Sequence, residues 1–395
     1  MKFKVQNRAI TGLALVAMLL ATPLAAQDDF KWPRLLVIGT PGTSTGSFAS
    51  TNGWAPVMQQ ETGMTVRVVP NGAEPERYKR LVDRRDIQIS SVSASEMRFQ
   101  IQGIGGYAAV PAKSMRMIWH HNDTPWGFVT SGKSGVTALE DLKKGGLKFA
   151  QAASSPAMTD AVKVGMPAYL GMTQEEVDSK ITYVPTSSYG ENCKSVVEGK
   201  ADIAYCSPIS SVLSEMEAAP GSIRWLPMPA DNPGWAAYLS FNPMLVPATF
   251  TVGVSSAKGV PGATSNFVYT VPTDADEDFV YHMAKWFDTS FATYSKTHML
   301  AARMSRELWR GYLDRTPMPV HAGTVRYLRE IGVWTDADDK WNGEAIATMD
   351  AWIAARDAAL KDARNQKVEI NFENPEYLAI LEKHTKGLTE FRSRL

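Results

Sequence analysis

The stretch RLLVIGTPGTSTGS, residues 34–47, places a short apolar run directly before a loop of glycines and hydroxyl side chains. Residues 35–39 predict a buried strand, and Ser44 or Thr45 is placed to cap the helix that follows. The first turn of a helix has unpaired N–H groups and the positive end of the helix dipole, so this loop is suited to hold an anion. Because it has no lysine and lacks the Walker A spacing, a small carboxylate fits it better than a nucleotide phosphate. The alternative is a strand, turn and helix that bind nothing.

The N-terminus has the order of a secretory signal peptide. A basic start is followed by an apolar run from Ile10 to Leu20 and then by small residues up to Gln27. The apolar run is too short to span a bilayer, and an uncleaved anchor is the weaker alternative. We therefore predict a signal peptide over residues 1–26, cleavage near Ala26 and a mature chain exported to the periplasm.

The overall composition excludes some classes of partner. The 41 basic residues balance the 41 acidic ones, so the formal net charge is zero and neither nucleic acid nor an anionic membrane is expected as a partner. A chain of 395 residues favours two domains or lobes over one. We expect a monomer without a cofactor.

Cys193 and Cys206 are the only cysteines. Cys193 lies near the start of a helical pattern, and Cys206 ends the apolar strand 203–206. A helix followed by a returning strand would bring these two ends together. The sequence leaves two alternatives: the cysteines form a disulfide in an oxidising compartment, or they are a pair of buried thiols.

Predicted strands and helices alternate through the first half of the chain, which indicates parallel strands with helices on the faces of the sheet. The strands of the first series are predicted at 35–39, 65–69, 87–91, 115–119 and 127–131, and its helices at 47–60 and 75–83. A second series has strands at 147–151, 181–184 and 201–206, and helices at 137–144, 156–170 and 189–199. A late strand is predicted at 266–271, and helices dominate from 275 onward. The amphipathic helix 345–364 should dock on the sheet through Ile346, Met349, Ile353 and Leu360.

The predicted fold class is α/β, with two facing lobes that are each a mainly parallel sheet flanked by helices. Lobe I is predicted over residues 27–120 and 245–332, and lobe II over 121–244. Residues 333–395 form a helical extension packed on lobe I. The chain should cross between the lobes near His120–Trp126 and again near Asn242–Pro247.

Small hydroxyl and amide residues recur where predicted strands end. Ligands of open α/β sheets bind beyond the carboxyl ends of the strands, so these residues predict a polar pocket between the lobes. The segments are Thr43–Ser47, Asn71–Ala73, Ser90–Ser95, Ser154–Ser155 and Cys206–Pro208. Phe48 and Trp126 are candidates for aromatic walls of this pocket.

The sequence gives little support for catalysis or for a metal. His120 and His121 are adjacent, so in a strand they point to opposite faces and cannot chelate one ion; a strand end with a turn is expected there. Glu96 and Glu191 are single carboxylates, expected to be solvated helix residues. We therefore predict that the protein is not an enzyme.

The order and spacing of several motifs resemble the TAXI family, the solute-binding subunits of TRAP transporters. The motifs are residues 38–47, 70–95, 135–145, 198–203, 247–249 and 316–323. The resemblance implies a two-lobed, periplasmic-binding-protein-like receptor without a reaction of its own. Such a receptor binds a small organic anion, which is a carboxylate, a dicarboxylate or an acidic amino acid, and delivers it to the TRAP membrane permease. A ligand-sensing receptor for a membrane signalling protein would use the same scaffold, and the sequence leaves that alternative open.

The resemblance also implies which residues contact the ligand. They are Ser44, Thr45, Ser47, Phe48, Asn71, Gly72, Ser91, Ser93, Ser154, Ser155, Ser207 and Thr249. One departure concerns the first loop, where Gly46-Ser47-Phe48 lacks the tyrosine hydroxyl of the family pattern. That departure argues against a glutamate-type ligand.

Overall fold

The apolar run after Arg34 forms strand β1 (Leu35–Thr40) in the computed structural model, which describes Met1, residues 30–313, Thr316 and residues 318–391. From Trp32 onward the chain forms one compact unit. Residues 2–26 of the predicted signal peptide lie outside the described residues, so the cleavage site stays a prediction. Across the described ranges, no helix is at once long and apolar enough to cross a membrane.

The main sheet has the strand order β2-β1-β3-β10-β4-β7, with β8 paired to β4 and β9 paired to β10. The strands β2, β1 and β3 are parallel, as the alternation of strands and helices predicted. Strand β10 is antiparallel to both β3 and β4. The bounds of these other strands are β2 (Thr65–Pro70), β3 (Ile89–Ser93), β4 (Met115–Ser131), β7 (Ala204–Cys206), β8 (Ile223–Leu226), β9 (Val246–Thr249) and β10 (Pro261–Pro272). A smaller parallel sheet consists of β5 (Leu147–Ala152) and β6 (Ile181–Thr186). The α/β fold class is confirmed, with parallel strands in both sheets.

One long strand replaces two predicted short ones. The strands expected at 115–119 and 127–131 are parts of β4, whose 17 residues pair with β10 along most of their length. The prediction of a strand end and turn at His120–Asp123 is therefore wrong. The ladder continues through these residues because Asn122 and Asp123 pair with Phe267 and Asn266 of β10.

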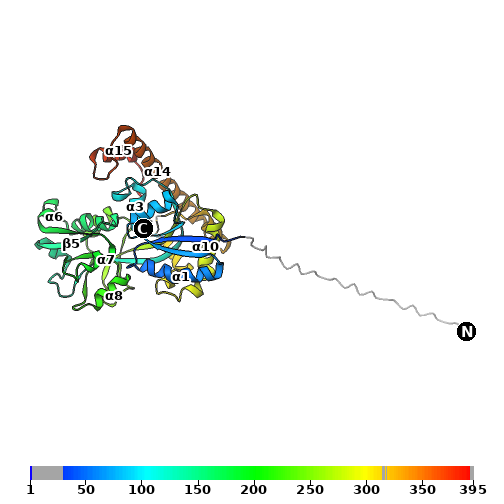
Figure 1. The fold of residues 1–395 in the computed structure, drawn as a ribbon, viewed down its shortest axis with the longest axis horizontal. Helices are drawn as coiled ribbons and strands as arrows, with labels where there is room; N and C mark the ends of the chain where they lie inside the picture. Colours follow the sequence, from blue (N-terminus) through cyan, green and yellow to red (C-terminus); the bar gives the residue numbers. More distant parts are fainter. Residues whose placement is uncertain (2–29, 314–315, 317, 392–395) are drawn as a thin grey trace. The chain divides into compact units, whose positions relative to one another are not determined.

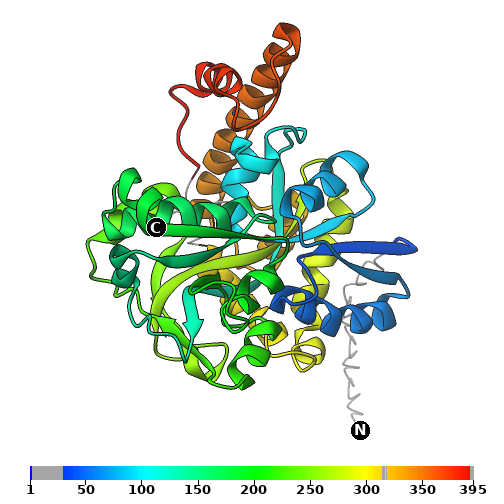
Figure 2. The same ribbon diagram turned by 60° about the vertical axis from the view of Figure 1, so that its left-hand side comes forward.

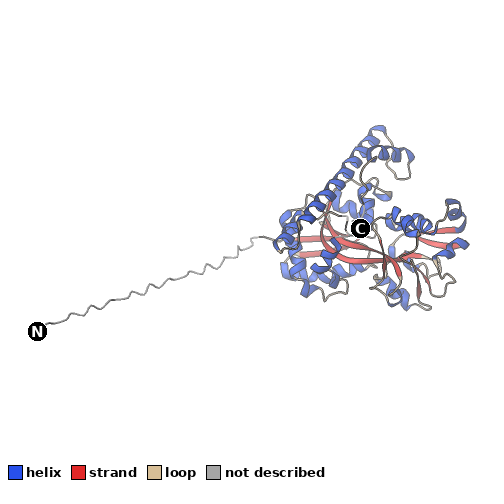
Figure 3. Ribbon diagram, turned by 180° about the vertical axis from the view of Figure 1, so that it is seen from behind, coloured by secondary structure: helices blue, strands red, loops and turns tan. Residues whose placement is uncertain are grey.

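Buried side chains form two main cores, and β4 and β10 run from one to the other. The first core draws on residues 36–119 and 268–391, with Ala157 and Met244, and the second core draws on residues 126–267. The second crossing was predicted near Asn242–Pro247, but Leu245, Phe250 and Ala263 all pack in the second core. The chain therefore returns from the second core to the first along strand β10. The lobe boundaries as a whole stay a prediction. In Figure 3 the strands run continuously between the two helical regions.

Helices flank the strands at both cores. Helices α1 and α10 lie beside the strands of the first core, and α6, α7 and α8 lie around the second (Figure 1). The helices near the first core are α1 (Gly46–Thr62), α2 (Glu74–Lys79), α3 (Ala94–Gln102), α10 (Glu277–Thr289), α11 (Phe291–Tyr294), α12 (Arg306–Leu313) and α13 (Ala322–Glu330). Those near the second are α4 (Pro156–Asp160), α5 (Met166–Leu170), α6 (Gln174–Lys180), α7 (Tyr189–Lys194), α8 (Ser211–Ala218) and α9 (Gly234–Phe241). The sequence analysis gave no bounds for helix α3, although it expected Glu96 to lie on a helix.

The C-terminal segment forms the helices α14 (Asp336–Gln366) and α15 (Pro375–Thr385), which extend from the first core (Figure 2). Of the residues predicted to dock this helix, Met349 packs in the first core and Leu360 in a small separate core with Tyr377. Arg356 is fully buried and donates hydrogen bonds to the carbonyls of Gln100 (2.6 Å), Ile101 (3.3 Å), Tyr107 (3.0 Å) and Val110 (3.1 Å). The extension is thereby fixed to the end of α3 and the loop that follows it.

Candidate ligand pocket

A cavity of about 60 Å³ lies between the two cores, where strand ends meet helix starts. A buried water needs roughly 10–15 Å³, so the cavity has room for more than a single water. Many of the residues predicted from the sequence line it: Thr45, Ser47, Gly72, Ser93, Trp126, Ser154, Ser155 and Ser207. The expectation that hydroxyl-rich strand ends converge agrees with this geometry, whereas their ligand-binding role stays a prediction.

The first predicted helix cap is present at this cavity. Helix α1 begins at Gly46, and the Thr45 hydroxyl accepts a hydrogen bond of 3.3 Å from the backbone N–H of Phe48. Ser47 follows, and its hydroxyl lies 2.7 Å from that of Ser91. The N-terminus of a 17-residue helix therefore faces the cavity, as the loop sequence predicted.

Other predicted residues lie outside the lining. Ser91 is fully buried behind Ser47 and bonds His121 Nδ1 at 3.1 Å, so it supports the wall without forming it. The Asn71 side chain is turned back to accept a hydrogen bond from the N–H of Ala73 (3.0 Å).

Ser44, Phe48 and Thr249 are likewise not part of the wall. Ser44 and Phe48 are half-buried outside the lining, and Thr249 is exposed in β9, where it pairs with Pro261. Of the two aromatic walls proposed from the sequence, only Trp126 lines the cavity.

The two histidines of β4 are structural. His121 stacks on Tyr269 (centroids 4.6 Å apart) and His120 on Tyr312 (4.2 Å), so they point to opposite faces as expected. Burial lowers the pKa of His120 to about 3 and holds the pKa of His121 well below its usual value. Both rings are therefore neutral at physiological pH. No group of three His, Cys, Asp or Glu residues in the described part of the chain is arranged to hold a metal ion.

Aromatic rings that the sequence analysis missed complete one wall. Trp126 stacks on Tyr205, with centroids 5.2 Å apart and planes 17° apart, and meets Tyr189 edge-on at 6.4 Å. Phe267 of β10 also lines the cavity. No sequence signal distinguishes these rings from core aromatics, because tertiary packing of α7, β7, β4 and β10 brings them to the cavity.

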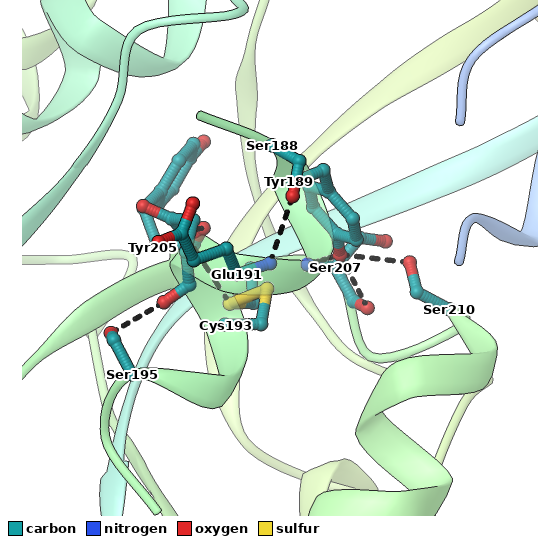
Figure 4. Close-up of a disulfide and its surroundings, with 10 residues drawn as sticks. Ser188, Tyr189, Glu191, Cys193, Ser195, Tyr205, Ser207 and Ser210 are labelled. Carbon is teal, nitrogen blue, oxygen red and sulfur yellow. Dashed lines mark hydrogen bonds between the residues drawn. A yellow bond between two sulfur atoms is a disulfide. The ribbon is translucent and has the colours of Figure 1, made fainter. Parts of the chain in front are cut away.

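A disulfide between Cys193 and Cys206 fixes this wall, and it resolves the alternatives left open by the sequence (Figure 4). It joins α7, which begins with Tyr189, to the end of β7. The Tyr189 hydroxyl accepts a hydrogen bond from the N–H of Ser207 (2.9 Å) and lies 2.8 Å from the Ser210 hydroxyl. Tyr189, Ser207 and Ser210, which all line the cavity, thus form one connected unit.

Several contacts join the two sides of the cavity. The Ser211 hydroxyl donates to the carbonyl of Ser44 (3.1 Å), and the N–H of Glu74 donates to the carbonyl of Ser154 (3.0 Å). The Ser155 hydroxyl donates to the Glu96 carboxyl group. These bonds connect elements around the first core to elements around the second, so the two sides of the cavity are closed onto each other.

Four buried polar atoms of the lining have no hydrogen-bond partner within the described ranges. They are Asn122 Nδ2, Trp126 Nε1, Ser207 Oγ and Asn242 Oδ1, on side chains at most 7% exposed. An unpaired buried polar group costs about 1–3 kcal/mol, so such groups call for a partner. Since Asn122 and Trp126 offer only N–H donors at these atoms, a ligand with acceptor oxygens suits them.

Two carboxyl groups also line the cavity, and one of them corrects a prediction. Glu96 was expected to be solvated, but it is 2% exposed and accepts a hydrogen bond from Tyr107 (3.1 Å). Burial, and then the nearby charge of Glu74, raises the pKa of Glu96 to about 8. Glu74 itself forms a buried ion pair with Arg77. The Ser-x-x-Glu spacing from Ser93 to Glu96 is a helix-start signal that could have predicted α3.

The NMT1-like family pattern matches residues 38–332 of this sequence. The chain belongs to the NMT1-like family. The match spans β1 through α13 and includes every residue that lines the cavity, whereas α14 and α15 lie beyond it. The narrower resemblance to the TAXI family stays a prediction.

Solved structures with a related fold include binding proteins of low sequence identity. A structure described as a periplasmic transporter is 14% identical, with 86% of this chain and 98% of that chain covered and a TM-score of 0.43. The periplasmic binding protein BugD is 11% identical, with coverages of 86% and 99% and a TM-score of 0.43. The substrate binding protein of an amino acid ABC transporter is 11% identical, with coverages of 68% and 98% and a TM-score of 0.41. Likeness at this level says nothing about ligand or partner. No curated protein sequence matches the chain significantly.

Proposed function

We propose that this NMT1-like family member is a periplasmic receptor that closes over a small carboxylate and delivers it to a TRAP-type membrane permease. It acts as a monomer after removal of the signal peptide and performs no reaction on the ligand. The observation that carries the proposal is the cavity between the two cores, which is lined by the start of α1 and by buried, unpartnered donors.

The donors available are sufficient for useful affinity. A hydrogen bond to a charged group contributes about 1.5–3 kcal/mol, and a helix N-terminus contributes roughly 0.3–2 kcal/mol. Asn122, Trp126 and Ser207 together with α1 therefore supply about 5–11 kcal/mol before the costs of association. Micromolar binding corresponds to about 8 kcal/mol, which lies within this range before the costs of association are subtracted.

A thermal-shift screen of the mature protein tests the ligand class. The panel is acetate, benzoate, succinate, glutarate and L-glutamate. At least one of them should raise the melting temperature with concentration, by the equivalent of about 2.7 kcal/mol at one hundred times its Kd. A panel in which nothing shifts the melting temperature refutes the proposal.

A pair of tryptophan variants tests the location of the site. Trp126→Phe removes one unpartnered donor from the cavity and should weaken binding about 10- to 150-fold. Trp309→Phe is the matched control, because Trp309 is also buried and its Nε1 also has no partner in the described part of the chain. Trp309 lies in the first core and does not line the cavity. Equal losses in both variants would place the ligand elsewhere.

The membrane partner needs its own test. Vesicles containing TRAP permease subunits should take up the bound carboxylate only when this protein is added. Binding without stimulated uptake would contradict the transport part of the proposal and favour a sensing receptor.

A further inference from the structure

Glu96 is a buried carboxyl group in the cavity wall without a free cation beside it. Among the described residues, no lysine or arginine lines the cavity. The positive charge that acts on Glu96 is that of Arg77. Arg77 is paired with Glu74 and also donates to the carbonyl of Asn71 (2.7 Å) and to the hydroxyl of Ser90 (3.3 Å). The guanidinium group of Arg77 is therefore already committed to other partners.

The groups that face Glu96 from the neighbouring elements are few. From α2 they are Glu74 and Arg77, and from the turn at 105–107 it is Tyr107. From the start of α4 the uncharged Ser155 donates a hydrogen bond. An anion at Glu74, low solvent exposure and a committed Arg77 together disfavour an ionised Glu96.

The other charged groups nearby are engaged elsewhere. On the same helix, Arg98 donates to the carbonyl of Phe241 (2.5 Å) and pairs with Glu390 (3.3 Å). From α14, Arg356 is bonded to the backbone carbonyls at the end of α3. No charge in the described surroundings is therefore left to balance an ionised Glu96 in the cavity.

The protonation state of Glu96 decides whether a carboxylate can enter. An ionised Glu96 would repel the ligand, because both charges would share a cavity of about 60 Å³. A neutral Glu96 has an O–H group and joins the unpartnered donors of Asn122, Trp126 and Ser207. The cavity is then lined by donors on several sides.

We propose that Glu96 holds a proton in the bound state and donates a hydrogen bond to the ligand's carboxylate, so the receptor captures the anion together with that proton. This inference rests on the proposed function. No covalent bond changes, and the proton is shared by Glu96 and the carboxylate. On release it stays on Glu96 below about pH 8 and returns to the solvent above that pH.

The direction of the pH dependence follows from linkage. Below about pH 8, Glu96 of the free receptor already holds the proton, so the affinity is constant. Above that pH, binding must take up a proton from solvent. The affinity should therefore fall about tenfold between pH 7 and pH 9.

Titration calorimetry with the tightest binder among acetate, benzoate, succinate and glutarate tests this. None of these probes titrates between pH 7 and 9. Wild type should bind about tenfold more weakly at pH 9 than at pH 7. At pH 9, titrations in two buffers of different ionisation enthalpy should report uptake of about 0.9 proton.

Two variants test whether the pH dependence comes from Glu96 and not from another carboxyl group. Glu96→Gln should remove both the pH dependence of the affinity and the proton uptake. Glu191→Gln is the control, since Glu191 is partly exposed on α7 and bonded to Ser187, and it should keep the wild-type profile. If Glu96→Gln does not fold, the proton uptake of wild type alone decides.

The outcomes that would overturn the role of Glu96 are distinct from failure of the proposed function. Affinity that is constant or rises above pH 8, or release of protons on binding, overturns it. Binding of L-glutamate without binding of glutarate also overturns it, because an ammonium group would then be needed beside an ionised Glu96. If no carboxylate binds at all, the proposed function itself fails.

Discussion

Adding a single methyl group at Gly46 should destabilise the closed arrangement of the cavity and so weaken ligand binding. It is the first residue of α1, and a Cβ placed on it would lie 2.8 Å from the carbonyl oxygen of Ile209 and 2.7 Å from Cδ1 of Leu300. The Leu300 side chain can move, but the Ile209 carbonyl is backbone of the opposite wall. An ordinary contact begins at 3.4 Å, so Gly46→Ala must push that wall back by about 0.6 Å (3.4 minus 2.8).

The expected size of the effect follows from the cost of overpacking. An added methylene in a tight contact costs typically 1–3 kcal/mol, which corresponds to about 5- to 150-fold weaker carboxylate binding. An open receptor does not feel the contact with Ile209. The melting temperature of the ligand-free protein should therefore stay within a few degrees of wild type.

Titration calorimetry and thermal unfolding of Gly46→Ala measure the two quantities together. Gly343→Ala is the matched control, because a Cβ at Gly343 on α14 meets nothing within 4 Å. It should leave the affinity unchanged. If Gly46→Ala binds as tightly as wild type, the contact between α1 and Ile209 is not part of the bound state and the reasoning fails.

Three further substitutions test what holds the pocket in place. Replacing Cys193 and Cys206 with alanine should lower the free energy of unfolding by about 3 kcal/mol in urea, because the bond closes a loop of sequence separation 13; unchanged stability would contradict this. Arg356→Met leaves four carbonyls without their donor and should cost about 3 kcal/mol, whereas the exposed Arg364→Met should cost little. Since the pKa of Glu96 is raised from 4.5 to about 8, the stability from its neutral form is present at acid pH and lost as the pH rises. Between pH 5 and 9, the free energy of unfolding of wild type in urea should fall by up to about 4 kcal/mol relative to that of Glu96→Gln. If the two proteins show the same dependence of stability on pH, the raised pKa of Glu96 is refuted.

The parts of the fold that sequence predicted well are those in which neighbours in the chain decide the structure. The apolar run of β1 and the cap at Thr45 lie within eleven residues of each other, and both are present where the pattern placed them. The hydroxyls of Ser93, Ser155 and Ser207 lie at strand ends or helix caps for the same local reason. Their convergence on one cavity follows because strand ends meet at one edge of each sheet.

The errors concern residues whose partners are remote. His120 to Asp123 look like a turn because polar residues are uncommon in a buried strand. They remain in β4 because β10 pairs with them, and the two strands are joined by bonds such as Thr264 to Thr124, which are 140 positions apart. The burial of Glu96 likewise depends on Tyr107 and on Ser155, which is 59 positions away.

By itself, the sequence determined the alternation of strands and helices and the hydroxyl-rich helix starts, because hydrophobic period, capping and turn preferences act over a few residues. It left open whether Cys193 and Cys206 pair. Only the tertiary structure decided that β4 and β10 form one continuous connection and that Asn122, Trp126 and Glu96 share a cavity wall. The physical reason is that burial and loss of solvation depend on surfaces brought from distant parts of the chain. A carboxyl group that looks solvated in a helix pattern becomes a proton-holding group because it is buried beside Tyr107 and Glu74, which come from other elements of the fold.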